Sequence, residues 1–343
     1  MIVKKGLRLL ARSQVYNRFY TEEKWEQVNP ENKEILQDFL EEYKQQKKSK
    51  GTIYGYEQDI RIIFIYILEK KNNKCVLDLK KKDFRSLSLW LTEEKKLSSA
   101  RVNRMKSALN SMLTFCEDDD EYEYEINYAK KVKGLAKEKV RNDEDDFFFT
   151  FDEFIKIRDI LVEKEKLQEA VIWSLGFDSA GRRNELYQVQ KHGLLDGNKT
   201  NVVKGKRGKL FSLVYLDDTK EIIRQYLEER GDDDIDSLWY HTVNGEKVEY
   251  ATSEFIYSKI CNISKLLSEL RGEECNIFPH TLRHSRAECL SSGEDNRLKD
   301  SDGNNRVYNL DEIMVFMHHE NVDTTKSYMK NKDDDIINDM FGF

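Results

Sequence analysis

The sequence predicts a mainly α-helical protein that carries one small β-hairpin and is divided into two domains. The chain has 343 residues, enough for two domains that each have a core. It holds only two prolines, and apolar residues recur at helical spacing along most of its length. One pair of β-type runs, at 200–204 and 209–216, is separated by a turn that contains two glycines.

Four amphipathic helices are expected between residues 34 and 118 and form the first domain. In the first of them Ile35, Phe39 and Tyr43 repeat at intervals of four, which places them on one face. Ser98 or Ser99 is the expected N-cap of the fourth. The four predicted ranges are 34–48, 52–70, 80–94 and 98–116. Residues 1–33 are expected to be an N-terminal extension.

A change in composition marks the expected boundary between the domains. The acidic run 117–125 is followed by a lysine-rich stretch, so residues 119–146 are predicted to be an exposed linker. The second domain is then expected to span 147–343. Its first helix begins after Thr150, an N-cap candidate, and a second helix covers 167–177. Beyond residue 218 the pattern is mostly helical, interrupted by glycine-containing loops.

Charge and cysteine content restrict the class of protein. The net charge of −7 argues by itself against a nucleic-acid partner. The charges are segregated, however: residues 34–116 hold 17 Lys or Arg against 11 Asp or Glu, and a polyanion responds to local potential. No apolar run reaches the roughly 18 residues that a membrane span needs. Five widely spaced cysteines without a C-x-x-C pair predict free thiols, and we expect a cytoplasmic protein without a membrane partner.

Three segments of the second domain carry side chains suited to phosphate chemistry. Residues 174–189 (SLGFDSAGRRNELYQV) place an arginine pair at a turn between two helices. In 278–290 (FPHTLRHSRAECL), His280 and Arg283 stand three apart on one helical face. In 315–329 (VFMHHENVDTTKSYM), a histidine precedes a tyrosine by nine positions.

Together these segments resemble the tyrosine recombinases, also called phage integrases. The family's box T-G-x-R-x-x-E-L corresponds to 179–186 (SAGRRNEL), and its box H-x-x-R-H is present unaltered at 280–284 (HTLRH). Its third box, L-G-H followed nine residues later by tyrosine, corresponds to 317–319 (MHH) and Tyr328. Its lysine hairpin, G-K-G-x-K, corresponds to 205–209 (GKRGK). The resemblance extends from residue 34 to the end of the sequence.

The resemblance implies both an architecture and a set of catalytic residues. The four-helix segment is expected to be a SAM-like core-binding domain, followed by a tyrosine-recombinase catalytic domain. The implied catalytic residues are Arg182, Lys206, His280, Arg283, His319 and Tyr328, with Lys209 as the alternative to Lys206 and Glu185 as the partner that holds Arg182.

These side chains fit the cleavage of a DNA phosphodiester. Two guanidinium groups can fork onto the non-bridging oxygens, and neither loses its proton. Tyr328 would attack phosphorus and form a 3′-phosphotyrosyl intermediate, while Lys206 would protonate the departing 5′ oxygen. His280 and His319 would position the phosphate and carry the tyrosine proton. No metal ion or other cofactor is implied.

Two departures from the family pattern stand out. His318 occupies the position of the family's glycine in the third box. Arg283 and His319 are 36 positions apart, more than is usual in the family, and the excess lies in the loop 291–309. This loop is either a surface insertion or a contact for a partner.

The sequence therefore predicts a site-specific recombinase or integrase of a mobile element. Three alternatives stay open: a Xer-type chromosome or plasmid resolvase, a metal-dependent nuclease that uses His280, His284 and His319, and a DNA-binding module without strand cleavage. The expected partners are a double-stranded recombination site, further copies of the chain in a dimer and a synaptic tetramer, and accessory DNA-bending proteins. When bound to DNA, the protein would be associated with the nucleoid.

Contacts to DNA are expected from the first domain. The candidates are polar residues ahead of the second helix and on the fourth. They are Lys50, Thr52, Arg101, Asn103, Arg104 and Lys106. On the fourth helix the polar face is expected opposite Val102, Met105 and Leu109.

Overall fold

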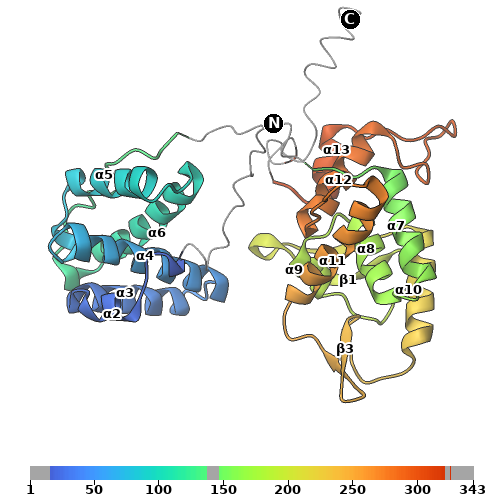
Figure 1. Cartoon of the computed structure of the whole chain (residues 1–343), viewed down its shortest axis with the longest axis horizontal. Helices are drawn as coiled ribbons and strands as arrows, with labels where there is room; N and C mark the ends of the chain where they lie inside the picture. The colour runs from blue at the N-terminus through green and yellow to red at the C-terminus, as the bar shows by residue number, and fades with distance from the viewer. Residues whose placement is uncertain (1–15, 137–146, 321–324, 326–343) are drawn as a thin grey trace, which may run out of the picture. The chain divides into compact units, whose positions relative to one another are not determined.

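The computed structural model describes residues 16–136, 147–320 and 325. The chain divides into two compact units, 1–140 and 141–343, each of which has its own core (Figure 1). We call them unit 1 and unit 2. None of the helices in these described ranges is long and apolar enough to cross a membrane.

Unit 1 is a bundle of helices around α4, which packs against α2, α3 and α6. Residues 58–60 and 62–67 of α4 are buried, so this helix forms the centre of the bundle. The four predicted helices are confirmed. The helices are α2 (Glu22–Gln27), α3 (Pro30–Gln45), α4 (Lys50–Lys70), α5 (Lys81–Leu89) with a π-helical turn at Trp90–Glu94, and α6 (Ser99–Asp118).

The starts of α4 and α6 are fixed by serine caps. The Ser49 hydroxyl accepts a hydrogen bond from the Thr52 amide at 3.1 Å, and α4 begins two residues before the predicted start. The Ser98 hydroxyl accepts from the Arg101 amide at 3.3 Å, which identifies Ser98 as the cap of α6.

The core of unit 1 extends beyond the predicted range of 34–118 at both ends. Tyr16, Phe19 and Val28 are buried in it before α3, and Tyr124 and Ala129 are buried in it after α6. The sequence does not indicate that the segment after α6 packs on the core, because its buried Tyr124 stands among acidic residues that are typical of an exposed loop. Much of the expected extension and linker is therefore part of the folded unit.

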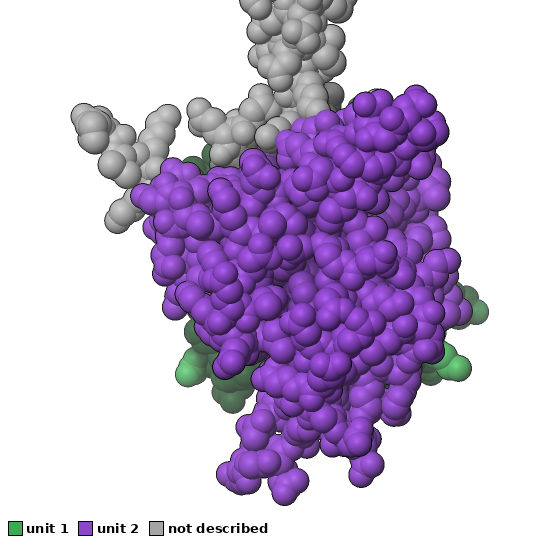
Figure 2. Space-filling model, turned by 90° about the vertical axis from the view of Figure 1, so that its right-hand side faces the viewer, with its two compact units in different colours: residues 1–140 green, residues 141–343 purple. Residues whose placement is uncertain are grey.

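Unit 2 is built around α8 (Leu167–Asp178), whose last nine residues are all buried. Helices α7, α10, α11 and α12 pack around it, and side chains fill the spaces between them into a continuous surface (Figures 1 and 2). Thr150 caps α7 in a reciprocal capping box with Glu153, as predicted. The other helices are α7 (Phe151–Glu163), α9 (Arg183–Tyr187), α10 (Asp217–Arg230), α11 (Glu254–Arg271), α12 (Pro279–Ser292) and α13 (Leu310–Phe316).

Two antiparallel hairpins complete unit 2. Strands β1 (Lys199–Lys204) and β2 (Leu210–Val214) form the predicted hairpin. Strands β3 (Tyr240–Val243) and β4 (Glu246–Glu249) form a second one, which lies in a region expected to be helix and loop. Asn244 and Gly245 join them, and both have positive φ, as a two-residue hairpin turn requires.

Candidate active site

The turn between α8 and α9 presents Arg182. Ala180 has a φ of +48°, and a Cβ on Gly181 would lie 2.9 Å from the Ser179 hydroxyl, so the turn is both bent and crowded. Arg182 caps α9. Glu185, which is buried, accepts from the Arg182 backbone amide at 2.8 Å and from its guanidinium at 3.0 Å. This pair fixes the direction of the Arg182 side chain.

Arg283, which lies about one turn after the start of α12, connects the segments 174–189, 278–290 and 315–329. Its side chain is 2% exposed, and its guanidinium donates to the backbone carbonyls of Ala180 and Met317. Its Nη2 also lies 2.8 Å from Nε2 of His319. The arginine therefore ties the Arg182 turn to the turn that follows α13.

That turn places His319 against Arg283. His318, just after the Met317 cap of α13, has a φ of +54°, a left-handed conformation that costs an L-residue roughly 1–2 kcal/mol. His319 is buried, and its Nδ1 lies 2.9 Å from the hydroxyl of Thr325. Because Arg283 can only donate, Nε2 accepts and Nδ1 carries the hydrogen that it donates to Thr325.

Lys206 lies at the tip of the β1–β2 hairpin. The tip, Lys206–Gly208, is a single 3₁₀ turn with Arg207 in the left-handed region at φ +59°. A cavity of about 440 Å³ opens between this tip and the turn after α13. Its lining is rich in cations and consists of Arg182, Lys206, Arg207, Lys209, Phe211, His318, His319 and Glu320. Such a lining is suited to a phosphate group.

The structure brings most of the predicted site residues together. Arg182, Lys206 and His319 line the cavity, and Arg283 lies behind it in contact with His319. His280 is at the first turn of α12 and is exposed, and desolvation of its ring by the surrounding protein together with the charges of Arg283, Arg182 and Arg183 lowers its pKa. Tyr328 lies outside the described residues.

The metal-nuclease alternative finds no support in this geometry. Among residues 16–136, 147–320 and 325, no three His, Cys, Asp or Glu side chains are arranged to hold a metal ion. His280, His284 and His319 thus do not form the shared metal site that a nuclease of this kind requires.

Several residues of the cavity were not predicted. Arg207, Phe211 and Glu320 are among them, and no motif letter indicates them. Of the unpredicted cavity residues, His318 could have been singled out from the sequence, because it occupies the position where the family's third box has glycine.

His319, which is buried, and His284, which is partly buried, make the stability of unit 2 depend on pH. Burial and the neighbouring His280 and Arg283 lower the pKa of His284 to about 4, and burial, Arg283, Arg182 and His318 lower that of His319 to about 3. In the unfolded chain these rings titrate near 6.5. The unfolded state therefore binds more protons below pH 6.5, and stability falls as the pH drops from there towards 4.

We expect the free energy of unfolding of unit 2 to be roughly 2–4 kcal/mol lower at pH 5 than at pH 7.5. Denaturant titrations at the two pH values measure this difference. His284→Phe keeps a ring of similar size and should remove at most about half of the difference, because the pKa values of His280, His318 and His319 are lowered too. An unchanged pH dependence in this variant would show that His284 titrates normally in the folded state.

In unit 1, Lys50 and Thr52 lie in the first turn of α4, where backbone amides and the helix dipole favour an anion. Lys50 is exposed, and the Thr52 hydroxyl is 2.9 Å from that of Ser49. On α6, Arg101 and Arg104 both pair with the buried carboxylate of Asp59, at 2.5 Å and 3.0 Å. Arg104 keeps 41% of its side chain exposed, whereas Arg101 keeps 14%.

The side chains of Asn103 and Lys106, two of the DNA contacts predicted on α6, are instead bonded within unit 1. The amide of Asn103 exchanges two hydrogen bonds with the backbone of Leu135, at 2.8 Å and 2.9 Å. The Lys106 ammonium donates to the carbonyls of Val132 and Lys133, and the residue is 8% exposed. Both side chains hold the segment after α6 against the bundle, which local spacing on the helix cannot reveal.

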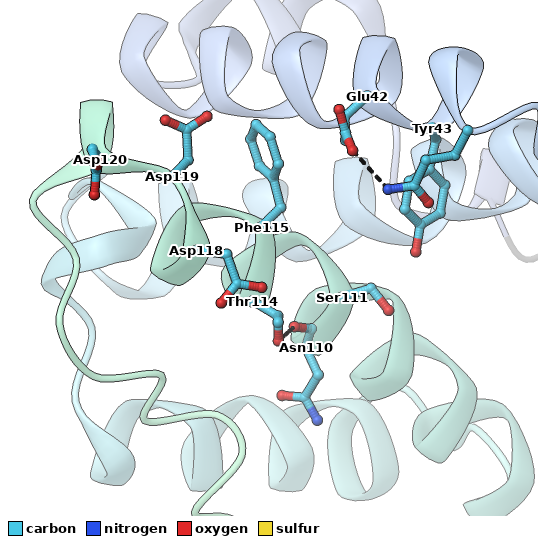
Figure 3. A pocket seen from close by; sticks show the side chains of 10 residues that line it. Glu42, Tyr43, Asn110, Ser111, Thr114, Phe115, Asp118, Asp119 and Asp120 are labelled. Carbon is cyan, nitrogen blue, oxygen red and sulfur yellow. Dashed lines mark hydrogen bonds between the residues drawn. The ribbon is translucent and has the colours of Figure 1, made fainter.

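A separate groove of about 730 Å³ lies between the ends of α3 and α6 (Figure 3). Glu42, Asp118, Asp119 and Asp120 are among the residues that line it, together with Tyr43 and Phe115. Four carboxylates repel phosphate, so this groove is unsuited to a nucleic-acid backbone despite its size.

The chain is similar to two known proteins that are named as recombinases. No model of a known protein family matches the chain. It is 27% identical over 285 residues to an SPbeta prophage-derived recombinase-like protein, YomM, of Bacillus subtilis, covering 77% of this chain and 80% of the relative. It is 23% identical over 294 residues to the tyrosine recombinase XerC of Treponema denticola, covering 82% and 88%.

Among solved structures, the fold is similar to that of a lambda integrase fragment crystallised as a dimer bound to a COC′ core site. The TM-score is 0.61 at 15% identity, with 86% of this chain and 94% of the integrase fragment covered. The predicted mainly α-helical fold with a small β-hairpin is thereby confirmed.

Proposed function

We propose that this chain, which belongs to the tyrosine recombinase family, is a site-specific DNA recombinase that cuts and rejoins strands through a 3′-phosphotyrosyl intermediate. One observation carries the proposal: Arg182, Lys206 and His319 line one cavity, and Arg283 binds His319 directly behind it. Arginine, lysine and histidine around one cavity can stabilise and protonate the groups of a phosphodiester, as a metal-independent transesterification needs.

In this mechanism the cations act on the scissile phosphate. Arg182, oriented by Glu185, forks onto the non-bridging oxygens and stabilises the charge that develops on them. Arg283 keeps the Arg182 turn and His319 in register and adds positive potential from behind. Lys206 delivers the proton to the departing 5′ oxygen, for which an amine on a mobile four-carbon stem is suited.

Tyr328 is the proposed nucleophile. Thr325 is buried and bonded to His319, and Tyr328 follows it by three positions, a length of chain that spans at most about 11 Å. A phenol with a pKa near 10 is a weak nucleophile, so the surrounding cations must favour the phenolate. His319 is neutral at pH 7 because burial and Arg283 lower its pKa, which suits a hydrogen-bonding role better than that of a strong base.

The substrate is proposed to be a double-stranded recombination site. Lys50, Thr52 and Arg104 offer phosphate contacts in unit 1, with Asp59 holding Arg101 and Arg104 together. The lambda integrase fragment binds its core site as a dimer, and we propose the same for this chain, with a tetramer in the synapse. Accessory DNA-bending proteins remain part of the proposal.

We favour a mobile-element integrase. The prophage-derived relative is 27% identical, which supports an element of this kind. The XerC relative, at 23%, supports a Xer-type resolvase as the second candidate. An assay with both kinds of substrate separates the two candidates. Joining of an element junction to a separate target DNA would favour the integrase, and resolution of directly repeated sites on one circular DNA would favour the resolvase.

A covalent adduct tests the central proposal. The purified chain, incubated in EDTA with end-labelled element-junction DNA that carries a nick near the cleavage site, should form a protease-sensitive adduct at the 3′ phosphate. Tyr328→Phe should form none while still binding the DNA. Cleavage that EDTA abolishes would point instead to a metal-dependent nuclease, and cleavage by Tyr328→Phe at the normal rate would exclude Tyr328 as the nucleophile.

A further inference from the structure

Two segments that are far apart in the sequence meet beside Lys206. The first is the tip of the β1–β2 hairpin with Phe211 behind it, and the second is the turn 318–320 that follows α13. Residues 206–210 at the tip are exposed, so packing of the tip itself gives Lys206 little support. Backbone hydrogen bonds such as that from the Gly205 amide to the Lys209 carbonyl, at 2.8 Å, shape the turn, and side-chain contacts from the second segment add to them.

The ring of His318 makes one contact between them. It lies against the ring of Phe211, with ring centroids 3.8 Å apart and an interplanar angle of 32°. His318 makes this contact from a left-handed backbone position just after α13, where a glycine would be free of strain. His318 thus places a ring at a position whose backbone conformation favours glycine.

Phe211 also contacts the backbone of the turn that carries Lys206. It pairs with Val203 across the hairpin. A Cβ added to Gly205 would lie 2.6 Å from the Phe211 ring, so the ring rests directly on the backbone of the residue before Lys206. A displacement of the Phe211 ring would therefore displace the start of the lysine turn.

An ion pair joins the same two segments at a second point. The guanidinium of Arg207 pairs with the carboxylate of Glu320, one residue beyond His319. Both side chains are more than half exposed, so the pair contributes little by itself and will weaken with salt. Its position still matters, because it holds the other side of the Lys206 turn.

We propose that His318 is a positioning residue for Lys206, acting through Phe211 to hold the lysine turn beside His319. This inference rests on the proposed function, in which Lys206 protonates the leaving 5′ oxygen. Proton transfer requires close and well-aligned partners, so loosening the turn should slow that step and spare the others.

His318→Gly tests the inference, because it removes the ring and relaxes the backbone at φ +54°. With ordinary DNA we expect single-turnover cleavage to slow by about 10–100-fold, part of the 10²–10⁴ that a general acid supplies. A 5′-bridging phosphorothiolate has a leaving thiolate that needs no proton. On this substrate His318→Gly should cleave as fast as the unsubstituted protein. Lys206→Ala should show the same pattern, and His318→Phe, which keeps a ring, should retain most of the activity on ordinary DNA.

The matched control is Val315→Ala, a change at a 69% exposed position on α13. It should leave both rates unchanged, and thermal unfolding should show that His318→Gly is folded. Equal slowing of His318→Gly on both substrates would overturn the positioning role in favour of a general structural one, and no slowing on either would overturn it outright. A chain that forms no adduct even without substitution would overturn the proposed function and this inference with it.

Discussion

Replacing Arg182 by Ala is expected to slow strand cleavage by at least about 10²–10³-fold, whereas Arg183→Ala should stay within roughly fivefold of the unmodified rate. Arg182 lines the cationic cavity and is oriented by the buried Glu185. Arg183 points elsewhere: its guanidinium pairs at 2.8 Å with Glu254, and it does not line the cavity. Two adjacent arginines thus differ in what they can do to a phosphate.

Single-turnover cleavage of nicked junction DNA, with enzyme in excess, measures both rates. Filter binding under the same conditions should show that each variant still binds the DNA, since one lost phosphate contact lowers the salt slope by only about one unit. The reverse result, an inactive Arg183→Ala and an active Arg182→Ala, would mean that the first box is aligned one residue out of place.

The helices could be predicted because their cause is local. Apolar residues at helical spacing and cap residues such as Thr150 appear in the sequence itself, and the structure confirms the helices that they indicate. The β3–β4 hairpin was missed because its strands are polar and mostly exposed, so no apolar alternation marks them. Only the Asn244-Gly245 pair carried a signal for it.

The site residues could be predicted because the family's motifs consist of the reactive side chains themselves. The residues that hold these side chains in place could not be predicted. The motifs give Arg283 without indicating that it is buried and bonded to two backbone carbonyls. Helical spacing likewise failed for Lys106, whose hydrogen-bond partners lie after α6 in a segment expected to be a linker. In each case the hydrogen-bond partner is far away in the sequence, and a local sequence pattern gives no information about it.

The loop 291–309, whose role the sequence left open, is anchored to unit 2 by a buried charge network. Arg297 pairs with Asp178 at 2.8 Å, with Asp218 at 2.8 Å and with Asp295 at 2.8 Å. Arg286 pairs with Asp295 from α12 at 2.5 Å. The insertion is thereby tied to the end of α8 and the start of α10, which makes it a structural part of the unit.

Arg297→Ala is accordingly expected to lower the free energy of unfolding of unit 2 by about 3–5 kcal/mol, because it leaves buried carboxylates without their shared cation. Asp178 has no exposed side-chain area and cannot turn to water. Arg306→Ala is the matched control from the same loop: its pair with Glu312 is exposed, and its loss should change stability by no more than about 1 kcal/mol.

Urea unfolding of the two variants and of the unmodified chain measures these differences. Asp178→Asn in the Arg297→Ala background should recover part of the loss, since the amide removes a buried charge while keeping an acceptor for Thr219, whose hydroxyl donates to Asp178 at 2.6 Å. Equal stability of Arg297→Ala and Arg306→Ala would mean that the network is hydrated and that the loop is only a surface insertion. A large difference between them would show that the buried ion pairs of Arg297 anchor the loop to unit 2.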